Sequence, residues 1–178
     1  MLAITTLLSA PTADRINGII KSLETKFGLD DVQATPDPHL TYQLVGVEQP
    51  DTLEAVLAGV AAATPRFVAH STGLGVFPGP QPVIYIPVLR SNRLNALHGH
   101  ILRAIAPLCF QTDKFSASDL WLPHISLALH DTTPELLGPV LMYLNQETYN
   151  LAFDIENIAI LRQEGALFVR EAVFELGE

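Results

Sequence analysis

Hydrophobic and polar positions follow two different periods along the chain, and each period predicts one kind of element. Strands are predicted where apolar residues alternate or run together, at 2–9, 39–46, 67–76, 82–89, 124–129, 151–161 and 167–176. Helices are predicted where apolar residues recur three or four positions apart, at 12–27, 51–63, 91–106 and 134–145. Thr12 and Ser91 are expected to cap two of these helices, and Gly165 is expected to form a hairpin turn.

The order of the predicted elements repeats. Strand, helix, strand, helix and strand occur in half-repeats of about 1–78 and 82–162, and a C-terminal hairpin strand at 165–176 follows. Equivalent strands are offset by about 80 to 85 residues, although the two halves share almost no identical positions. The repeat predicts a single α+β domain over 1–178 with two pseudo-symmetric lobes. Each lobe is expected to be an antiparallel sheet with helices packed outside.

Two equivalent strands of the repeat present an imidazole beside a hydroxyl group. Side chains two residues apart on a strand point to the same face. His39, Thr41 and Gln43 are therefore expected on one face of their strand, and His124 and Ser126 on one face of the other. Pseudo-symmetry would bring both faces to one central groove.

This pattern suits phosphodiester cleavage without a metal ion. One neutral imidazole can accept a proton from the attacking hydroxyl or water, while a protonated imidazole donates one to the leaving oxygen. Histidine can do both because its ordinary pKa, about 6.5, keeps both forms available near neutral pH. The hydroxyls of Thr41 and Ser126 can donate hydrogen bonds to phosphate oxygens.

The letters of the motif alone are weak evidence. Four of the six histidines have Ser or Thr two positions later, because His70 and His130 also fit the pattern. His39 and His124 differ from the others in their context. Each follows a proline, lies in an alternating apolar strand and occupies the same position of the repeat. These features favour His39 and His124 as the catalytic pair.

The motifs around the two histidines resemble those of a known family. The segments 38–41 (PHLT) and 123–126 (PHIS) look like the paired motifs of the 2H phosphoesterase superfamily. The stretch 73–78 (GLGVFP) and the following strand are similar to its 2′-5′ RNA ligase-like members. The resemblance implies a bilobal fold around a central active-site cleft, two catalytic histidines and two phosphate-binding hydroxyls. Activities in this family include 2′,3′-cyclic phosphodiesterase, reversible 2′-5′ RNA joining and hydrolysis of ADP-ribose cyclic phosphate, none of which requires a metal.

The chain departs from the family pattern at two positions. Many 2′-5′ RNA ligase-like proteins have an arginine where this chain has Leu129, and Ser126 stands where threonine is more frequent. Serine keeps the hydroxyl group, so the cleavage chemistry is unaffected. The missing arginine argues against an RNA-sized substrate.

Five further residues are candidate substrate contacts, each with an alternative role in packing or on the surface. Thr5 and Tyr85 occupy equivalent places on the strands expected to flank the motif strands, and Gln43 continues one motif face. Trp121 and Lys114 lie in the loop before the second motif, where a base could stack or a phosphate could approach. Tyr42 alternates to the apolar side and is expected in the core.

Composition narrows the possible partners. Lys and Arg number 10 against 19 Asp and Glu, giving a formal net charge of −9, which argues against a broad surface for long nucleic acid. Apolar residues make up 48% of the chain, so it is expected to fold. The single cysteine, Cys109, excludes an internal disulfide and a cysteine-based zinc cluster. No export signal or membrane span is recognised, so we expect a cytoplasmic protein.

The leading hypothesis is therefore a metal-independent phosphodiesterase that needs no cofactor. Its substrate would be a 2′,3′-cyclic phosphate, or a 2′-5′-linked small nucleotide or RNA end, and the protein is expected to be a monomer. Two alternatives stay open at this point. One is a non-catalytic module that binds a nucleotide or phosphorylated metabolite, and the other is a 2′-5′ RNA ligase acting on tRNA halves.

Overall fold

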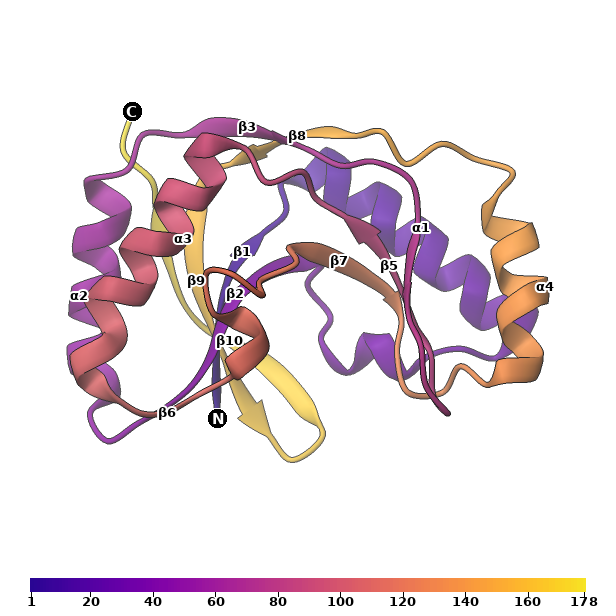
Figure 1. Ribbon diagram of the computed structural model, residues 1–178, viewed down its shortest axis with the longest axis horizontal. Coiled ribbons are helices and arrows are strands. Elements are labelled where there is room, and N and C mark those ends of the chain that lie inside the picture. Colours follow the sequence, from indigo (N-terminus) through magenta and orange to yellow (C-terminus); the bar gives the residue numbers. More distant parts are fainter.

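The computed structural model describes all residues, 1–178, and contains four α-helices and three antiparallel sheets (Figure 1). The largest sheet has the strand order β10-β9-β1-β2-β6, and the others have the orders β4-β5-β7 and β3-β8. The predicted α+β class is thereby confirmed. The strands are β1 (Leu2–Leu7), β2 (His39–Val47), β3 (Phe67–His70), β4 (Gly75–Phe77), β5 (Val83–Pro87), β6 (Cys109–Thr112), β7 (His124–Ala128), β8 (Ala152–Ile155), β9 (Asn157–Glu164) and β10 (Leu167–Glu175).

Two of the four helices each pack against a different sheet from the one whose strand precedes them. The four are α1 (Ala10–Phe27), α2 (Pro50–Ala62), α3 (Asn92–Ile105) and α4 (Pro134–Leu144). Helix α1 follows β1 of the five-stranded sheet but contacts β7 and α4, whereas α3 follows β5 and contacts β2 and α2. Helices α2 and α3 thus lie together at one end of the molecule, and α1 and α4 at the other (Figure 1). Each lobe is therefore built from both halves of the sequence.

The repeat is visible in the strand registers. In the β1–β2 pair, Thr5 lies opposite Thr41, and in the β5–β7 pair Tyr85 lies opposite Ser126. Both pairings shift register immediately before these residues, at Thr5 and at Tyr85. One geometry, including its irregularity, therefore occurs twice in the fold.

The apolar faces of the motif strands belong to one large core. Leu40 and Tyr42 on β2 and Ile125 and Leu127 on β7 are almost fully buried, with at most 1% of each exposed. The hydroxyl of Tyr42 lies 2.6 Å from the Thr6 hydroxyl, so its polar end is satisfied within the core. The expected core position of Tyr42 is confirmed. Burial of one face leaves the histidine face of each strand to form a site.

Element boundaries differ from the predictions in several places. Helix α1 begins at Ala10 with Ser9 at its N-cap position, so the prediction that Thr12 caps it is wrong. Proline is favoured in the first helical turn, and Pro11 occupies that turn here. Ser91 does cap α3, because its hydroxyl accepts the Leu94 N–H at 3.2 Å.

Two predicted strands are each divided, and one predicted loop contains structure. The stretch 67–76 forms β3 and β4, separated by a turn in which Gly73 has a φ of +61°. The stretch 151–161 forms β8 and the start of β9. The predicted loop 109–121 contains the edge strand β6 and the short helix η3 (Lys114–Ser116), after the short helix η2 (Ala106–Leu108). None of the helices combines the length and apolar character that a membrane crossing requires.

Candidate active site

The two motif histidines occupy the same backbone environment. His39 begins β2 and His124 begins β7, and each imidazole Nδ1 contacts the carbonyl oxygen two residues earlier. The distances are 2.8 Å from His39 to the Asp37 carbonyl and 2.7 Å from His124 to the Leu122 carbonyl. Because a carbonyl can only accept, Nδ1 carries the hydrogen in both rings. Each neutral imidazole therefore keeps the Nε2 lone pair available to accept a proton.

Burial favours the uncharged form of both imidazoles. The pKa of His39 is lowered chiefly by desolvation, against the opposing effect of the Asp37 carbonyl hydrogen bond, and a positive charge on His124 lowers it further. The pKa of His124 is lowered by desolvation, with an opposing contribution from the Leu122 carbonyl. A positive charge on His124 therefore disfavours a second positive charge on His39.

A cavity of about 440 Å³ brings together side chains from both motif strands. His39, Thr41 and Ser126 line it, and so do Leu44 and Leu129, which follow the two hydroxyls by three residues each. The cavity thus joins two hydroxyl groups that are 85 positions apart in sequence, since 126 − 41 = 85. His124 is not part of this wall. It lies two residues before Ser126 at the start of the same strand.

Aromatic rings surround His124. Its ring centroid lies 5.1 Å from that of Phe77 and 5.2 Å from that of Tyr85, and the Phe77 and Tyr85 rings stack on each other at 4.2 Å. Tyr85 is 7% exposed, and the glycine opposite it, Gly75, leaves room for its ring. The structure therefore places Tyr85 against the second histidine. The equivalent residue on β1, Thr5, is fully buried and donates a long hydrogen bond to the Ala159 carbonyl.

The structure corrects the predicted position of Gln43. Gln43 is 3% exposed, and its Oε1 accepts the backbone N–H groups of Leu44 and Asp113. The register shift in the β1–β2 pair interrupts strict alternation, so Leu44 lines the cavity in its place. The prediction that Gln43 continues the face of His39 and Thr41 is therefore wrong.

Trp121 and Lys114 also lie outside the cavity wall. Trp121 is 4% exposed, stacks on His98 at 3.8 Å and donates from Nε1 to the Thr41 carbonyl at 3.0 Å. It thereby supports the strand that carries Thr41, and packing is its observed role. Lys114 is exposed, with its ammonium group 4.9 Å from the Phe115 ring centroid.

Sequence reasoning did not find several residues of the cavity wall. Asp31 and Asp37 contribute carboxylates, and Phe168 contributes an aromatic ring from the β9–β10 hairpin. Arg170, also on β10, donates to both carboxylate oxygens of Asp37 at 2.6 and 3.1 Å. Phe168 and Arg170 reach the site from more than 100 positions away in sequence, whereas Asp31 and Asp37 lie shortly before His39 but follow no recognised motif. His130 also lines the cavity, although its pattern alone gave no reason to prefer it.

Comparisons with known proteins agree with the overall fold. A family model described as 2′-5′ RNA ligase superfamily matches residues 10–167. Protein TT0787 of Thermus thermophilus is 19% identical, with a TM-score of 0.69 over 99% of this chain and 98% of that chain. LigT of E. coli, in complex with 3′-AMP, is 17% identical, with a TM-score of 0.66 over 99% and 98%. Usb1 of Kluyveromyces marxianus is 12% identical, with a TM-score of 0.51 over 99% and 97%. No curated protein sequence matches the chain.

Proposed function

The chain belongs to the 2′-5′ RNA ligase superfamily, and from that premise we propose that it is a metal-independent phosphodiesterase using paired-histidine acid–base catalysis. Its substrate would be a 2′,3′-cyclic phosphate, or a 2′-5′-linked small nucleotide or RNA end. The observation that carries the proposal is the repeated geometry. Both histidines begin equivalent strands, leave Nε2 free and stand two residues before a hydroxyl that lines one cavity.

In the proposed reaction, one proton is taken from the attacking water and another is given to the leaving ribose oxygen. Nε2 of the neutral imidazole accepts a proton from water as the water oxygen forms a bond to phosphorus. The other imidazole, in its protonated form, donates a proton to the ribose oxygen as the bond from that oxygen to phosphorus breaks. A cyclic phosphate becomes a phosphate monoester and a free ribose hydroxyl. The pair ends with its protons exchanged, and either histidine can begin as the base.

Thr41 and Ser126 would hold the phosphate between the imidazoles. A hydroxyl can donate to a non-bridging oxygen, and such donors stabilise the charge that develops on that oxygen in the transition state. The two hydroxyls come from opposite lobes and share one cavity. They could therefore contact two different oxygens of a single phosphate group.

The size and lining of the cavity support a small ligand. A volume of about 440 Å³ lies in the range of small-molecule sites, roughly 300 to 1,000 Å³. No lysine or arginine lines the wall, and binding a long RNA strand depends on such side chains. Structures of E. coli LigT hold 3′-AMP, ATP and NADP⁺, which supports a nucleotide as the ligand class.

The test is hydrolysis of 2′,3′-cyclic nucleotides and 2′-5′ dinucleotides in the presence of EDTA. His39→Ala and His124→Ala are each expected to lower kcat/KM by about 10²- to 10⁴-fold, the usual contribution of a general acid or base. His100→Ala is the matched control, because His100 is exposed on α3 and does not line the cavity. Circular dichroism would verify that all variants are folded.

Three outcomes would contradict the proposal. Undiminished activity of either motif-histidine variant would exclude the paired mechanism. Loss of wild-type activity with EDTA, restored by a divalent metal, would exclude metal-independent chemistry. Nucleotide binding without turnover of any substrate would favour a non-catalytic binding module.

A further inference from the structure

The cavity wall carries an aspartate–histidine pair that the acid–base mechanism does not use. Asp31, in the short helix η1 (Asp31–Ala34), and His130, just after β7, both line the cavity. Asp31 Oδ2 accepts the His130 backbone N–H at 3.2 Å and lies 3.0 Å from His130 Nδ1. The other carboxylate oxygen of Asp31, Oδ1, has no hydrogen-bond partner in the protein. Asp31 can therefore accept a hydrogen bond from a ligand.

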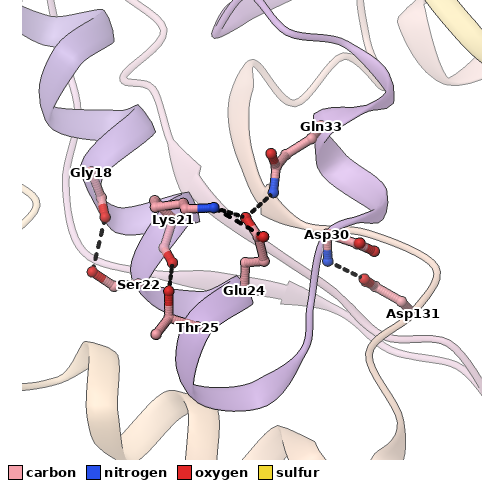
Figure 2. Close-up of polar contacts among 8 residues, drawn as sticks. All are labelled: Gly18, Lys21, Ser22, Glu24, Thr25, Asp30, Gln33 and Asp131. Carbon is pink, nitrogen blue, oxygen red and sulfur yellow. Dashed lines mark hydrogen bonds and ion pairs between the residues drawn. The ribbon is translucent and has the colours of Figure 1, made fainter.

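Several contacts hold the segment that carries Asp31 in position. The Asp131 carboxylate accepts the backbone N–H of Asp30 at 2.6 Å, as Figure 2 shows, and that of Asp31 at 2.9 Å. The Asp31 carboxylate in turn accepts the His130 backbone N–H, so hydrogen bonds join η1 and the segment after β7 in both directions. On the other side of η1, the Gln33 amide donates to Glu24 of α1 at 2.8 Å. A side chain anchored in this way is already ordered before a ligand binds, which reduces the entropy cost of binding.

Asp31 is also the least compensated carboxylate in the cavity wall. The wall contains two carboxylates, Asp31 and Asp37, and no lysine or arginine. Arg170 neutralises Asp37 through two hydrogen bonds. Asp31 is paired only with His130, and no lysine or arginine contacts it. The wall near Asp31 therefore lacks the permanent positive charge that Arg170 supplies at Asp37.

We propose that the Asp31 carboxylate determines which nucleotides this site accepts. Its carboxylate would accept a hydrogen bond from an uncharged hydroxyl or amino group of the nucleoside, and would repel a second phosphate on the substrate. The inference rests on the proposed function. It adds a preference for a nucleoside cyclic phosphate with a free 5′-hydroxyl over the same molecule carrying a 5′-phosphate. The apolar wall formed by Leu44, Leu129 and Phe168 suits an uncharged nucleoside in the same way.

The experiment compares kcat/KM for adenosine 2′,3′-cyclic phosphate and for its 5′-phosphorylated form at pH 7.5. The wild type is expected to prefer the 5′-hydroxyl form by about tenfold, because the Asp31 carboxylate and a 5′-phosphate would repel each other at close range. Asp31→Asn is expected to reduce that preference to about twofold, chiefly through KM. His130→Asn keeps the Asp31 charge and is expected to retain the preference. Asp119→Asn removes an exposed carboxylate outside the wall and controls for net charge.

The outcomes separate this inference from the proposed function. If the enzyme hydrolyses the cyclic nucleotide but Asp31→Asn leaves the preference unchanged, the inference is overturned and the proposed function stands. If no variant hydrolyses either substrate, the proposed function fails. Calorimetric binding of adenosine 3′-monophosphate and adenosine 3′,5′-bisphosphate then tests the same selectivity without catalysis. Should Asp31→Asn fail to fold, the wild-type preference must shrink in 0.5 M salt, because salt screens the repulsion, and a preference unaffected by salt overturns the inference.

Discussion

Strands β2 and β7 present the same two functional groups from the same backbone geometry, but their surroundings differ. Both histidines place Nδ1 against the carbonyl two residues earlier. The neighbouring groups of His39 are charged. They are Asp37 and Arg170, which lies on β10 and donates two hydrogen bonds to the Asp37 carboxylate. Around His124, the neighbours are the aromatic rings of Phe77 and Tyr85. The repeat thus supplies two equivalently placed imidazoles, and their neighbours make their surroundings different.

The difference arises at one pair of equivalent positions. Thr5 is small and buried opposite Thr41, whereas Tyr85 lies opposite Ser126 and extends its ring to His124. The large ring fits because Gly75 has no side chain. A substitution on the flanking strand can therefore change the surroundings of one histidine without altering the strand that carries it.

After the two histidine variants, the largest expected effect tests the equivalence of the two hydroxyls. Thr41→Val and Ser126→Ala each remove one donor to the phosphate, and each is expected to lower kcat/KM by about 10- to 100-fold, somewhat less than a full oxyanion-hole donor. The exchanges Thr41→Ser and Ser126→Thr keep the hydroxyl and should retain activity within a few-fold. A large loss of kcat/KM in only one of the variants Thr41→Val and Ser126→Ala would show that the two hydroxyls do not both bind the phosphate.

A second prediction removes the aromatic environment of His124. In Gly75→Ala the new methyl carbon would stand 2.4 Å from Tyr85 ring carbons, so the buried ring must move. We expect a loss of about 1–3 kcal/mol in the free energy of unfolding, as in other overpacked sites, and about tenfold lower kcat/KM. Urea denaturation and the cyclic phosphate assay would measure these effects.

The matched control is Gly46→Ala on β2. Its added carbon would meet the Phe110 ring at 2.7 Å, but that ring is 68% exposed and can swing away. Stability and activity should change little. Equal effects of both substitutions would mean that the aromatic neighbours have no special influence on His124.

A third prediction concerns the pH dependence of the two histidines. In the proposed mechanism the active form carries one proton on the pair, so kcat/KM should follow a bell whose maximum lies midway between the two pKa values of the free protein. Because burial lowers the pKa of both His39 and His124, that maximum should fall below about pH 6.5, the ordinary value for histidine. Rates measured from pH 4.5 to 8.5 at substrate concentrations far below KM would locate it. A maximum above pH 7 would contradict the assignment of these two groups.

The smallest expected effect is on stability. A folded-state pKa below the unfolded value means that the unfolded chain binds more protons, so stability is lost as pH falls through and below about 6.5. Replacing both histidines, as in the double variant His39→Asn and His124→Asn, should flatten this decline relative to the wild type. Urea midpoints at several pH values between 5 and 8 would test it, and parallel curves for the two proteins would exclude the linkage.

How far the sequence predicts this site depends on whether a contact is local. Alternation placed His39 beside Thr41 and His124 beside Ser126, because a strand has a fixed period of two. The same rule failed at Gln43, where a register shift depends on the partner strand and leaves no clear trace in sequence. Contacts such as Asp31 with His130, which are 99 positions apart, depend on the tertiary fold and could not be predicted.

The exchanged helices have a consequence for how this chain can fold and how it could have arisen. Strand β1 pairs with β9, and Thr5 bonds to Ala159 across 154 positions, so neither lobe is complete until nearly the whole chain is available. Such distant pairing slows folding, because long loops must close before the contacts that stabilise them form. A half-length chain could complete neither lobe by itself, whereas two copies that exchanged the equivalents of α1 and α3, and of β4 and β9, would complete both. The single chain has the architecture of a domain-swapped dimer whose two subunits are joined end to end.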